Sequence, residues 1–276
     1  EGDEYDSAFF DKTAKFLKYL PDVAVVGNLE FDHADIYADF EAIRSAVRRL
    51  VALLPQRGLL VLGADNPAAL EMREDAPCRV MTFGLTEAAE WRATRVEPAP
   101  DSTRFVVEHR GQRVADLRVP LVGEFNVRNA LAAFAVATDA GLDAATIIAS
   151  VGRFEGVRRR LELRGRARGV SVYDDFAHHP TAVRETLAGV RAAFPSRRIW
   201  ALFEPRSATS CRRVFQEDFA GAFTVADEVI IGRVYRSSLP EGERLSEDEL
   251  VVGICATGVR ARYLGEVGDI VRVLVD

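Results

Sequence analysis

Val172-Tyr-Asp-Asp-Phe-Ala-His-His-Pro-Thr181 joins the end of a predicted buried strand, near residues 171–173, to the start of a predicted helix. Pro180 and Thr181 are typical of a first helical turn, and apolar residues recur after them at helical spacing. Two carboxylates and two imidazoles therefore follow the carboxyl end of a strand, which is where open α/β sheets bind ligands. From this stretch alone, a purely structural role for these residues is equally open. In that case an aspartate would cap the helix, and the histidines would form local hydrogen bonds.

The same succession of strand, polar turn and helix repeats around this stretch. Strands are predicted at about 170–174, 198–203, 228–231 and 261–264, alternating with helices at about 181–194, 212–223, 246–253 and 268–275. This alternation predicts an α/β fold with right-handed crossovers and a mostly parallel sheet covered on both faces. The polar clusters 174–179, 204–207 and 233–236 each follow a strand, so they are expected to converge on one edge of the sheet.

The preceding half of the chain has a different pattern. Strands are predicted at 23–26, 58–62 and 80–83, an antiparallel pair at 105–109 and 113–119, and helices from Asp39 to Pro55, at 130–140 and at 144–153. The pattern changes at Phe154-Glu-Gly-Val157. The chain is therefore divided into a domain at 1–154 and a second domain at 155–276.

Composition limits the class of protein. A chain of 276 residues that is 48% hydrophobic can bury a large core and form two domains. The net charge of −6 argues against a general nucleic-acid surface, and no apolar run reaches membrane-spanning length. Neither a nucleic acid nor a membrane is expected as a partner. Cys78, Cys211 and Cys255 have no metal or redox spacing, which fits a reducing cytoplasm.

Five motifs occur in order along the chain: Glu1-Gly-Asp-Glu-Tyr-Asp6, Asn28-Leu-Glu-Phe-Asp-His33, Gly123-Glu-Phe-Asn-Val-Arg-Asn129, Gly156-Val-Arg-Arg-Arg160 and Asp174-Asp-Phe-Ala-His-His-Pro180. Together they resemble the ordered motifs of the ATP-dependent Mur ligases. The resemblance implies the later part of a central ATPase domain at 1–154, followed by a Rossmann-like C-terminal domain. It also implies ATP and Mg²⁺ as cofactors. In this chemistry a muramoyl carboxylate attacks the γ-phosphate to give an acyl phosphate, which an amine then converts to an amide.

The same resemblance assigns roles to individual residues. Glu1 and His33 match magnesium positions, although imidazole is an uncommon ligand for a hard cation and His33 alone would suggest a core or capping histidine. Asn126 and Asn129 match adenine-proximal amides, with helix N-capping as the alternative for one of them. Three further matches concern the nucleotide: Arg160 and His178 near the phosphates, and Asp175 at a ribose hydroxyl. His33, Arg160 and His178 are thus the expected catalytic residues, whereas Arg158 and Arg159 are expected to be solvated.

Within the family, Phe203-Glu-Pro-Arg-Ser-Ala-Thr-Ser210 is most similar to the murein-recycling branch. Members of that branch join UDP-N-acetylmuramate to the peptide L-alanyl-γ-D-glutamyl-meso-diaminopimelate. Arg206, with Ser207 beside it, is expected to bind a carboxylate of this peptide, because a guanidinium can form a bidentate pair. A surface ion pair is the alternative role for Arg206.

Two departures from the family pattern bear on these roles. Phe125 stands where many relatives have histidine, and no lysine follows Lys18 that could be carbamylated beside a second metal. The recycling branch and the muramate–L-alanine branch are expected to act without that lysine.

The sequence has no Gly-Lys-Ser/Thr phosphate loop and no UDP-binding domain, so we expect a chain cut at both ends and inactive by itself. Two other functions remain open. A UDP-N-acetylmuramate–L-alanine ligase would be expected to have a His-Arg pair where Arg206 and Ser207 stand. A non-catalytic nucleotide-binding paralogue would have lost its phosphate loop. The upstream coding sequence distinguishes this last function from the two ligases.

Overall fold

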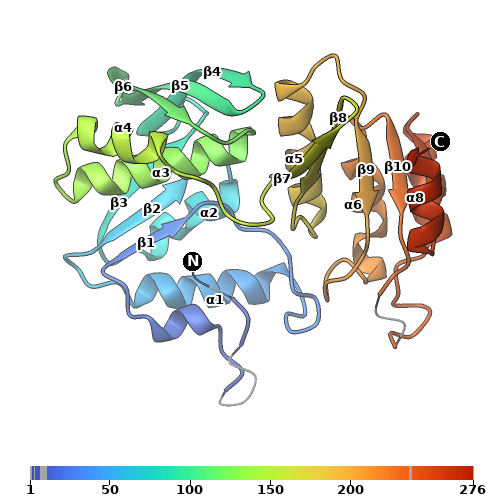
Figure 1. The fold of residues 1–276 in the computed structure, drawn as a ribbon. Helices are drawn as coiled ribbons and strands as arrows, with labels where there is room; N and C mark the ends of the chain where they lie inside the picture. Colours follow the sequence, from blue (N-terminus) through green and yellow to red (C-terminus); the bar gives the residue numbers. More distant parts are fainter. Residues whose placement is uncertain (1, 3, 7–10, 236–237, 276) are drawn as a thin grey trace. The chain divides into compact units, whose positions relative to one another are not determined.

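A computed structural model describes residues 2, 4–6, 11–235 and 238–275. The chain divides into two compact units, Glu1–Phe154 and Glu155–Asp276. Figure 1 labels their helices and strands along the chain. In the described residues no helix is both long and apolar enough to cross a membrane.

A single mixed sheet organises the first unit. Its strands lie in sequence order: β1 (Val23–Val26), β2 (Leu59–Gly63), β3 (Arg79–Gly84), β4 (Trp91–Ala99), β5 (Ser102–His109) and β6 (Gln112–Val119). Strands β1 to β4 are parallel, and β4, β5 and β6 pair antiparallel, which confirms the predicted β5–β6 pair. The sequence did not predict β4, because Pro98 and a register shift between Thr94 and Glu97 interrupt its alternation.

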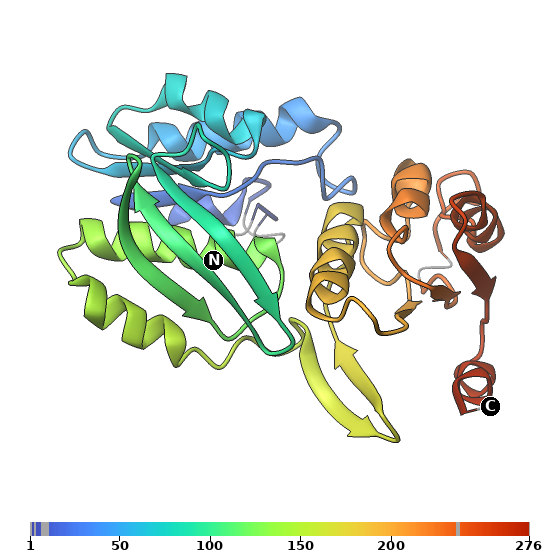
Figure 2. The ribbon, with the colours of Figure 1, turned by 90° about the horizontal axis from the view of Figure 1, so that it is seen from above.

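Helices cover both faces of this sheet where β2 lies (Figure 2). One face carries η1 (Lys15–Lys18), α1 (Phe40–Ala52), α2 (Pro67–Glu71) and η2 (Met72–Asp75), and the other carries α3 (Glu124–Asp139) and α4 (Ala144–Gly152). Successive side chains of β2 point to opposite faces, so Leu60 joins the core under α1 while Val61 joins the core under α3. Every residue of β2 is buried, as expected for a central parallel strand.

Helix α3 begins six residues before the predicted start at residue 130. Gly123 is its N-cap, with a φ of 97° that favours glycine, and Glu124 in the first turn suits the positive end of the helix dipole. Asn126 and Asn129 both lie inside the helix, so the alternative of an N-cap role is wrong for each. Glu124, Asn126, Arg128 and Asn129 are polar, so the apolar periodicity of the helix is weak at its start.

The second unit contains a parallel sheet in the order β11 (Arg260–Tyr263), β10 (Glu228–Ile231), β9 (Trp200–Phe203). Between and after these strands lie η3 (Arg213–Phe215), α6 (Gln216–Ala222), α7 (Glu247–Ala256) and α8 (Val267–Val275). Helix α5 (Pro180–Ala193) precedes β9. The predicted α/β class with mostly parallel strands is confirmed.

The strand predicted at 170–174 forms, but it is not part of the parallel sheet. It is β8 (Val170–Asp174), which pairs antiparallel with β7 (Glu162–Ala167) in a separate hairpin. Arg168 and Gly169 both have positive φ, 49° and 79°, as a tight hairpin turn of the I′ type requires. Residues 170–172 are exposed, so the expectation of a buried strand end is wrong. The arginine-rich sequence of β7 gave no strand signal.

Candidate functional site

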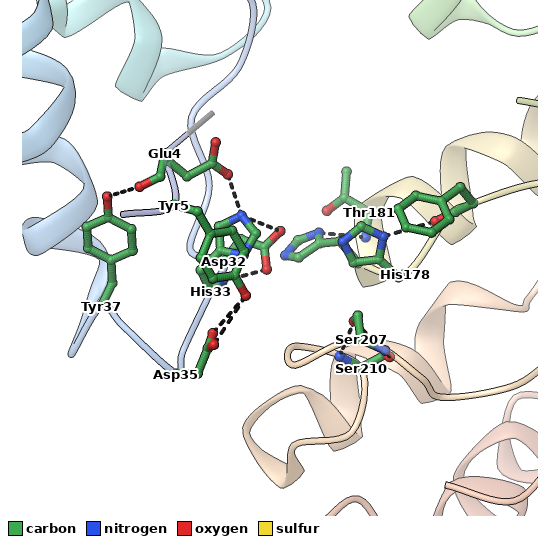
Figure 3. Close-up of polar contacts among 12 residues, drawn as sticks. Glu4, Tyr5, Asp32, His33, Asp35, Tyr37, His178, Thr181, Ser207 and Ser210 are labelled. Atoms are coloured by element: carbon green, nitrogen blue, oxygen red, sulfur yellow. Dashed lines mark hydrogen bonds and ion pairs between the residues drawn. The ribbon is translucent and has the colours of Figure 1, made fainter. Parts of the chain in front are cut away.

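His33 is the centre of a polar cluster in the first unit, in the loop between β1 and α1 (Figure 3). Its residue is 8% exposed, and Nε2 lies 2.5 Å from Oε1 of Glu4 and 3.8 Å from Oδ2 of Asp32. The backbone of His33 has a φ of 53°, and its amide donates to Oδ1 of Asp32 at 2.6 Å. Asp32 therefore holds the backbone of His33 while Glu4 holds its ring.

Two tyrosines fix this cluster in place. The ring of Tyr5 packs on the imidazole of His33 with centroids 4.1 Å apart, and its hydroxyl donates to Asp35 at 3.1 Å. The hydroxyl of Tyr37 donates to the carbonyl of Glu4 at 2.6 Å. The N-terminal segment around Glu4 is thus tied to the loop that carries His33.

The protonation of His33 reflects two opposing effects. Burial lowers the pKa of His33, while the hydrogen bond with Glu4 and the charges of Asp32, Glu4 and Asp35 raise it, and the net pKa lies above its ordinary value. Nδ1 of His33 is buried and has no hydrogen-bond partner among the described residues. The acidic neighbours of the ring therefore favour a positive charge at this position, from a proton or from a bound cation.

The donor set fits a divalent cation. Glu4, Asp32 and His33 each offer one ligand atom, and these atoms lie within 4.8 Å of one another. Two carboxylates suit a hard cation such as Mg²⁺, which also retains water ligands. Glu1, the predicted partner of His33, lies outside the described residues. Glu4 and Asp32 were not predicted as ligands, although Asp32 adjoins His33 and Glu4 belongs to the same acidic motif as Glu1.

Asn126 and Asn129 lie three residues apart at the start of α3, so they share one face of the helix. Nδ2 of Asn126 donates to the carbonyl of Val122 at 2.8 Å, and Asn129 is exposed. A side chain at Gly123 would lie 2.5 Å from the ring of Phe125, so this turn also requires glycine for space. Two amide side chains are presented together by a sterically restricted turn.

In the second unit, Asp175 holds the loop between β8 and α5. Its Oδ2 accepts from the amide of Leu161 at 2.7 Å, and its Oδ1 accepts from the amide of Ala177 at 2.8 Å. The first bond joins this loop to the segment that carries Arg160, whose side chain is exposed. The carboxylate of Asp175, predicted to meet a ribose hydroxyl, already accepts hydrogen bonds from two backbone amides.

The two histidines of the motif have different local roles. Nδ1 of His178 lies 2.9 Å from the carbonyl of Phe176. His179 is the N-cap of α5, where its Nδ1 accepts from the amide of Thr181 at 3.3 Å, so an imidazole rather than an aspartate caps this helix. His179 also packs on Phe215, with ring centroids 5.3 Å apart.

Arg159 is not a merely solvated neighbour of Arg160. Its Nε lies 3.6 Å from Oδ2 of Asp174, and its guanidinium lies over the ring of Phe176, 4.8 Å from the centroid. The carbonyl of Arg159 also accepts from the amide of Phe176 at 2.8 Å. This arginine therefore braces the loop, and Arg160 is left at the surface.

A closed network of hydrogen bonds organises the turn after β9. Ser210 is fully buried, and its Oγ accepts from the amides of Arg206 at 2.9 Å and Ser207 at 3.0 Å. Oγ of Ser207 donates to Oγ of Ser210 and accepts from the amide of Ser210, both at 2.9 Å. Figure 3 shows these two serines facing each other. The hydroxyl of Ser207, predicted to contact substrate, is therefore already engaged in the turn.

The side chain of Arg206 projects from this turn and is 61% exposed. It lies over the ring of Tyr235, 4.4 Å from the centroid, and 3.6 Å from the carboxylate of Glu204. The amide of Tyr235 donates to the carbonyl of Pro205 at 2.9 Å, which joins the loops after β9 and β10. Neither Ser210 nor Tyr235 was predicted as a site residue. Ser210 acts through hydrogen bonds inside its own turn, and Tyr235 reaches Arg206 from the loop after β10.

Both units match known protein families. The family profile described as "Mur ligase middle domain" matches residues 5–137, and the profile described as "Mur ligase, glutamate ligase domain" matches residues 159–274. A relative from Escherichia coli (strain K12), UDP-N-acetylmuramate--L-alanyl-gamma-D-glutamyl-meso-2,6-diaminoheptandioate ligase, is 40% identical over 84% of this chain and 50% of its own length. A UDP-N-acetylmuramate--L-alanine ligase from Desulfitobacterium hafniense (strain Y51) is 30% identical over 98% of this chain and 60% of its own.

A solved structure of a murein peptide ligase also resembles this chain over nearly its whole length. The murein peptide ligase of Psychrobacter arcticus 273-4 superposes with a TM-score of 0.66 at 31% identity, covering 99% of this chain and 56% of that one. The chain thus spans about half the length of the curated relatives that it matches.

Proposed function

The chain belongs to the Mur ligase family, and from this premise we propose that it is part of an ATP-dependent ligase of murein recycling. The proposed reaction joins UDP-N-acetylmuramate to L-alanyl-γ-D-glutamyl-meso-diaminopimelate through an acyl phosphate. The observation that carries this choice is Arg206 in the Pro205–Cys211 turn, whose backbone is fixed by a hydrogen bond and whose guanidinium is largely exposed. The identity to the Escherichia coli recycling ligase supports it.

The first unit supplies the proposed metal site. Glu4, Asp32 and His33, together with Glu1, would hold Mg²⁺, and the bound ion neutralises charge on ATP phosphates. A bound cation would take the place of a proton on the imidazole of His33, because a metal-bound imidazole is neutral. Asn126 and Asn129 are proposed to contact adenine, because they present two amides on one face of α3.

The second unit supplies the remaining nucleotide contacts that we propose. Arg160 and His178 would contact phosphate oxygens, and Asp175 would contact a ribose hydroxyl. The bonds from Leu161 and Ala177 to Asp175 support this arrangement, because they hold the loop that presents His178 next to the segment that presents Arg160. An exposed guanidinium such as that of Arg160 retains its donors for a phosphate.

Arg206 is the proposed peptide-binding residue. A preformed tripeptide carries carboxylates far from its attacking amine, and a guanidinium can grip one of them through two parallel hydrogen bonds. The ring of Tyr235 restricts the guanidinium before the peptide arrives, which reduces the conformational entropy lost on binding. Glu204, at 3.6 Å, is a weak exposed partner that a substrate carboxylate can replace.

The second candidate is a UDP-N-acetylmuramate–L-alanine ligase, which the match to the Desulfitobacterium hafniense relative over 98% of this chain favours. Its substrate carries a single carboxylate next to the amine, so it does not require a distant guanidinium. Both candidates use ATP and the same sugar nucleotide.

All three cysteines are free thiols, as suits the cytoplasm where these substrates occur.

The test uses a protein that contains these residues together with the remaining parts found in its relatives. ATP-dependent amide formation is measured with UDP-N-acetylmuramate and either the tripeptide or free L-alanine. We expect the tripeptide to be preferred, and Arg206→Lys to raise the Michaelis constant for tripeptide roughly tenfold while that for ATP changes little. Arg213→Lys, at an ion pair with Glu249, is the matched control. Preference for free L-alanine would contradict the proposal and select the second candidate.

A further inference from the structure

A buried carboxylate lies among three arginines at the beginning of the parallel strands of the second unit. Glu228 is the first residue of β10, and its side chain is 4% exposed. Its Oε1 is bound by Nη2 of Arg260 at 2.8 Å and by Arg198, and its Oε2 by Nη2 of Arg262 at 2.9 Å. We call Glu228, Arg198, Arg260 and Arg262 the arginine cluster.

The arginine cluster lies at the opposite end of the strands from the proposed peptide site. Glu228 pairs in register with Trp200 and Arg260, the first residues of β9 and β11. Arg206 and Tyr235 follow the other ends of β9 and β10. The cluster therefore has no part in the ligase chemistry proposed above.

The charges of the cluster do not balance. Three guanidinium groups surround one carboxylate, which leaves an excess of two positive charges. The neighbouring carboxylate of Asp227 is already bound by Nη2 of Arg191 and the amide of Ile199, at 2.6 and 2.7 Å. One guanidinium would suffice to neutralise the charge of one carboxylate, so two of the three positive charges are not balanced within the cluster. It is concentrated in a chain whose net charge is −6.

The guanidinium groups are held by contacts and remain accessible to solvent. Those of Arg198 and Arg262 lie over the ring of Trp200, 5.1 and 6.0 Å from its centroid. Cation–π contact and the carboxylate together fix their positions. The three arginine side chains are 45–68% exposed, and each binds Glu228 through Nη2, which leaves further N–H donors directed elsewhere.

We propose that the arginine cluster binds a small multivalent phosphate anion of the pyrophosphate class. Guanidinium donors match phosphate oxygens in pairs, and an anion with more than one negative charge would neutralise the excess that Glu228 leaves. The ligand would displace no hydrogen bond of Glu228, because it would use the outward N–H donors. Its binding would weaken with added salt, since the arginines are partly exposed.

The experiment titrates residues 1–276 with pyrophosphate at low ionic strength and measures calorimetric heat and tryptophan fluorescence. Trp200 is a local reporter, since the only other tryptophan, Trp91, is buried in the core of the first unit. We expect a saturable change that Trp200→Phe abolishes in fluorescence but not in calorimetry. Arg260→Gln should weaken binding roughly tenfold. Arg272→Gln on α8, an exposed arginine paired with Asp269, should leave binding unchanged.

A second variant separates a binding site from a purely structural cluster. Glu228→Gln removes a negative charge that repels the anion, so it should tighten pyrophosphate binding severalfold, with folding verified by circular dichroism. Weaker binding in a folded Glu228→Gln variant would contradict the proposal. Parallel titrations with ADP and adenosine show whether a nucleoside adds to the phosphate contact. The proposal is overturned by the absence of saturable binding at millimolar pyrophosphate. Equal weakening by Arg260→Gln and Arg272→Gln would also overturn it.

Discussion

His33 has one ring nitrogen bound to Glu4 and the other buried without a partner among the described residues. A buried unsatisfied nitrogen is costly, and it persists where the surrounding structure or a ligand compensates. Asp32 restrains the histidine through its backbone amide as well as through charge. The cluster is therefore prepared for a cation, which would compete with a proton for the imidazole.

The metal site gives a prediction at the level of one side chain. Glu4→Gln should weaken Mg²⁺ or Mn²⁺ binding by about tenfold or more, because it replaces a charged ligand by a neutral one. Metal affinity is measured by calorimetry on residues 1–276. Glu71→Gln, at an exposed ion pair with Arg44, is the control and should bind as the unmutated chain does. Unchanged affinity in Glu4→Gln would exclude Glu4 as a ligand.

Ser210 gives the second prediction, because its buried hydroxyl binds the two amides that orient Arg206. Ser210→Ala leaves these amides without their acceptor, at a cost of about 1–3 kcal/mol in free energy of unfolding. The loosened turn should also raise the Michaelis constant for tripeptide more than that for ATP.

Ser150→Ala, in an exposed turn of α4, is the control for both measurements. Both variants are made in the same ligase. Steady-state kinetics gives the Michaelis constants, and denaturant unfolding gives the free energy of unfolding. A loss of stability with no change in the tripeptide constant would limit Ser210 to a structural role.

At the level of elements, the sequence predicted strands and helices well where their apolar periodicity is strong. The helix after Asp39 and the strands at 59–63 and 228–231 follow directly from buried patterns. The strand β7 was not predicted because its residues are exposed and charged, without apolar periodicity. Its pairing with β8 follows from the tight turn at Arg168-Gly169. Glu4, Asp32 and Ser210 lie inside the quoted motifs, but their roles depend on three-dimensional contacts that the sequence does not show.

Asp227 links α5 to the start of β10 and supplies the third prediction. The amide of Ile199, and then the guanidinium of Arg191, hold the pKa of this carboxyl below its ordinary value of 3.8. A lowered pKa in the folded state means that the carboxylate stabilises the fold above pH 3.8. This stabilisation is lost as the pH falls below that value.

The measurement follows thermal unfolding of the unmutated chain and Asp227→Asn between pH 6 and pH 2.5. The variant should be less stable at pH 6, and the difference should shrink as the pH falls below about 3.8. Asp116→Asn on β6, at an exposed pair with Arg113, provides the comparison. A difference that stays constant over this range would show that Asp227 acts through its shape alone.

At the scale of the whole molecule, the division into two units follows from where apolar side chains are buried. The first unit has two apolar cores, one on each face of its sheet. In the second, Phe219 and Phe223 pack on Phe203 of β9, with ring centroids 5.0 and 5.6 Å apart. The change of pattern after Phe154 pointed to two domains from sequence alone, because each pattern belongs to its own sheet.

Separate cores predict separate losses of stability, which is the fourth prediction. Leu60→Ala in β2 and Phe219→Ala in α6 each remove a fully buried side chain, at a cost of about 2–5 kcal/mol. Hydrogen exchange of backbone amides should show faster exchange in residues 1–154 for the first variant and in residues 155–276 for the second. The two variants are each other's control, because they make the same kind of cavity in different units. If Leu60→Ala accelerated exchange in β9 and β10 as much as in β2 and β3, the chain would unfold as a single cooperative body.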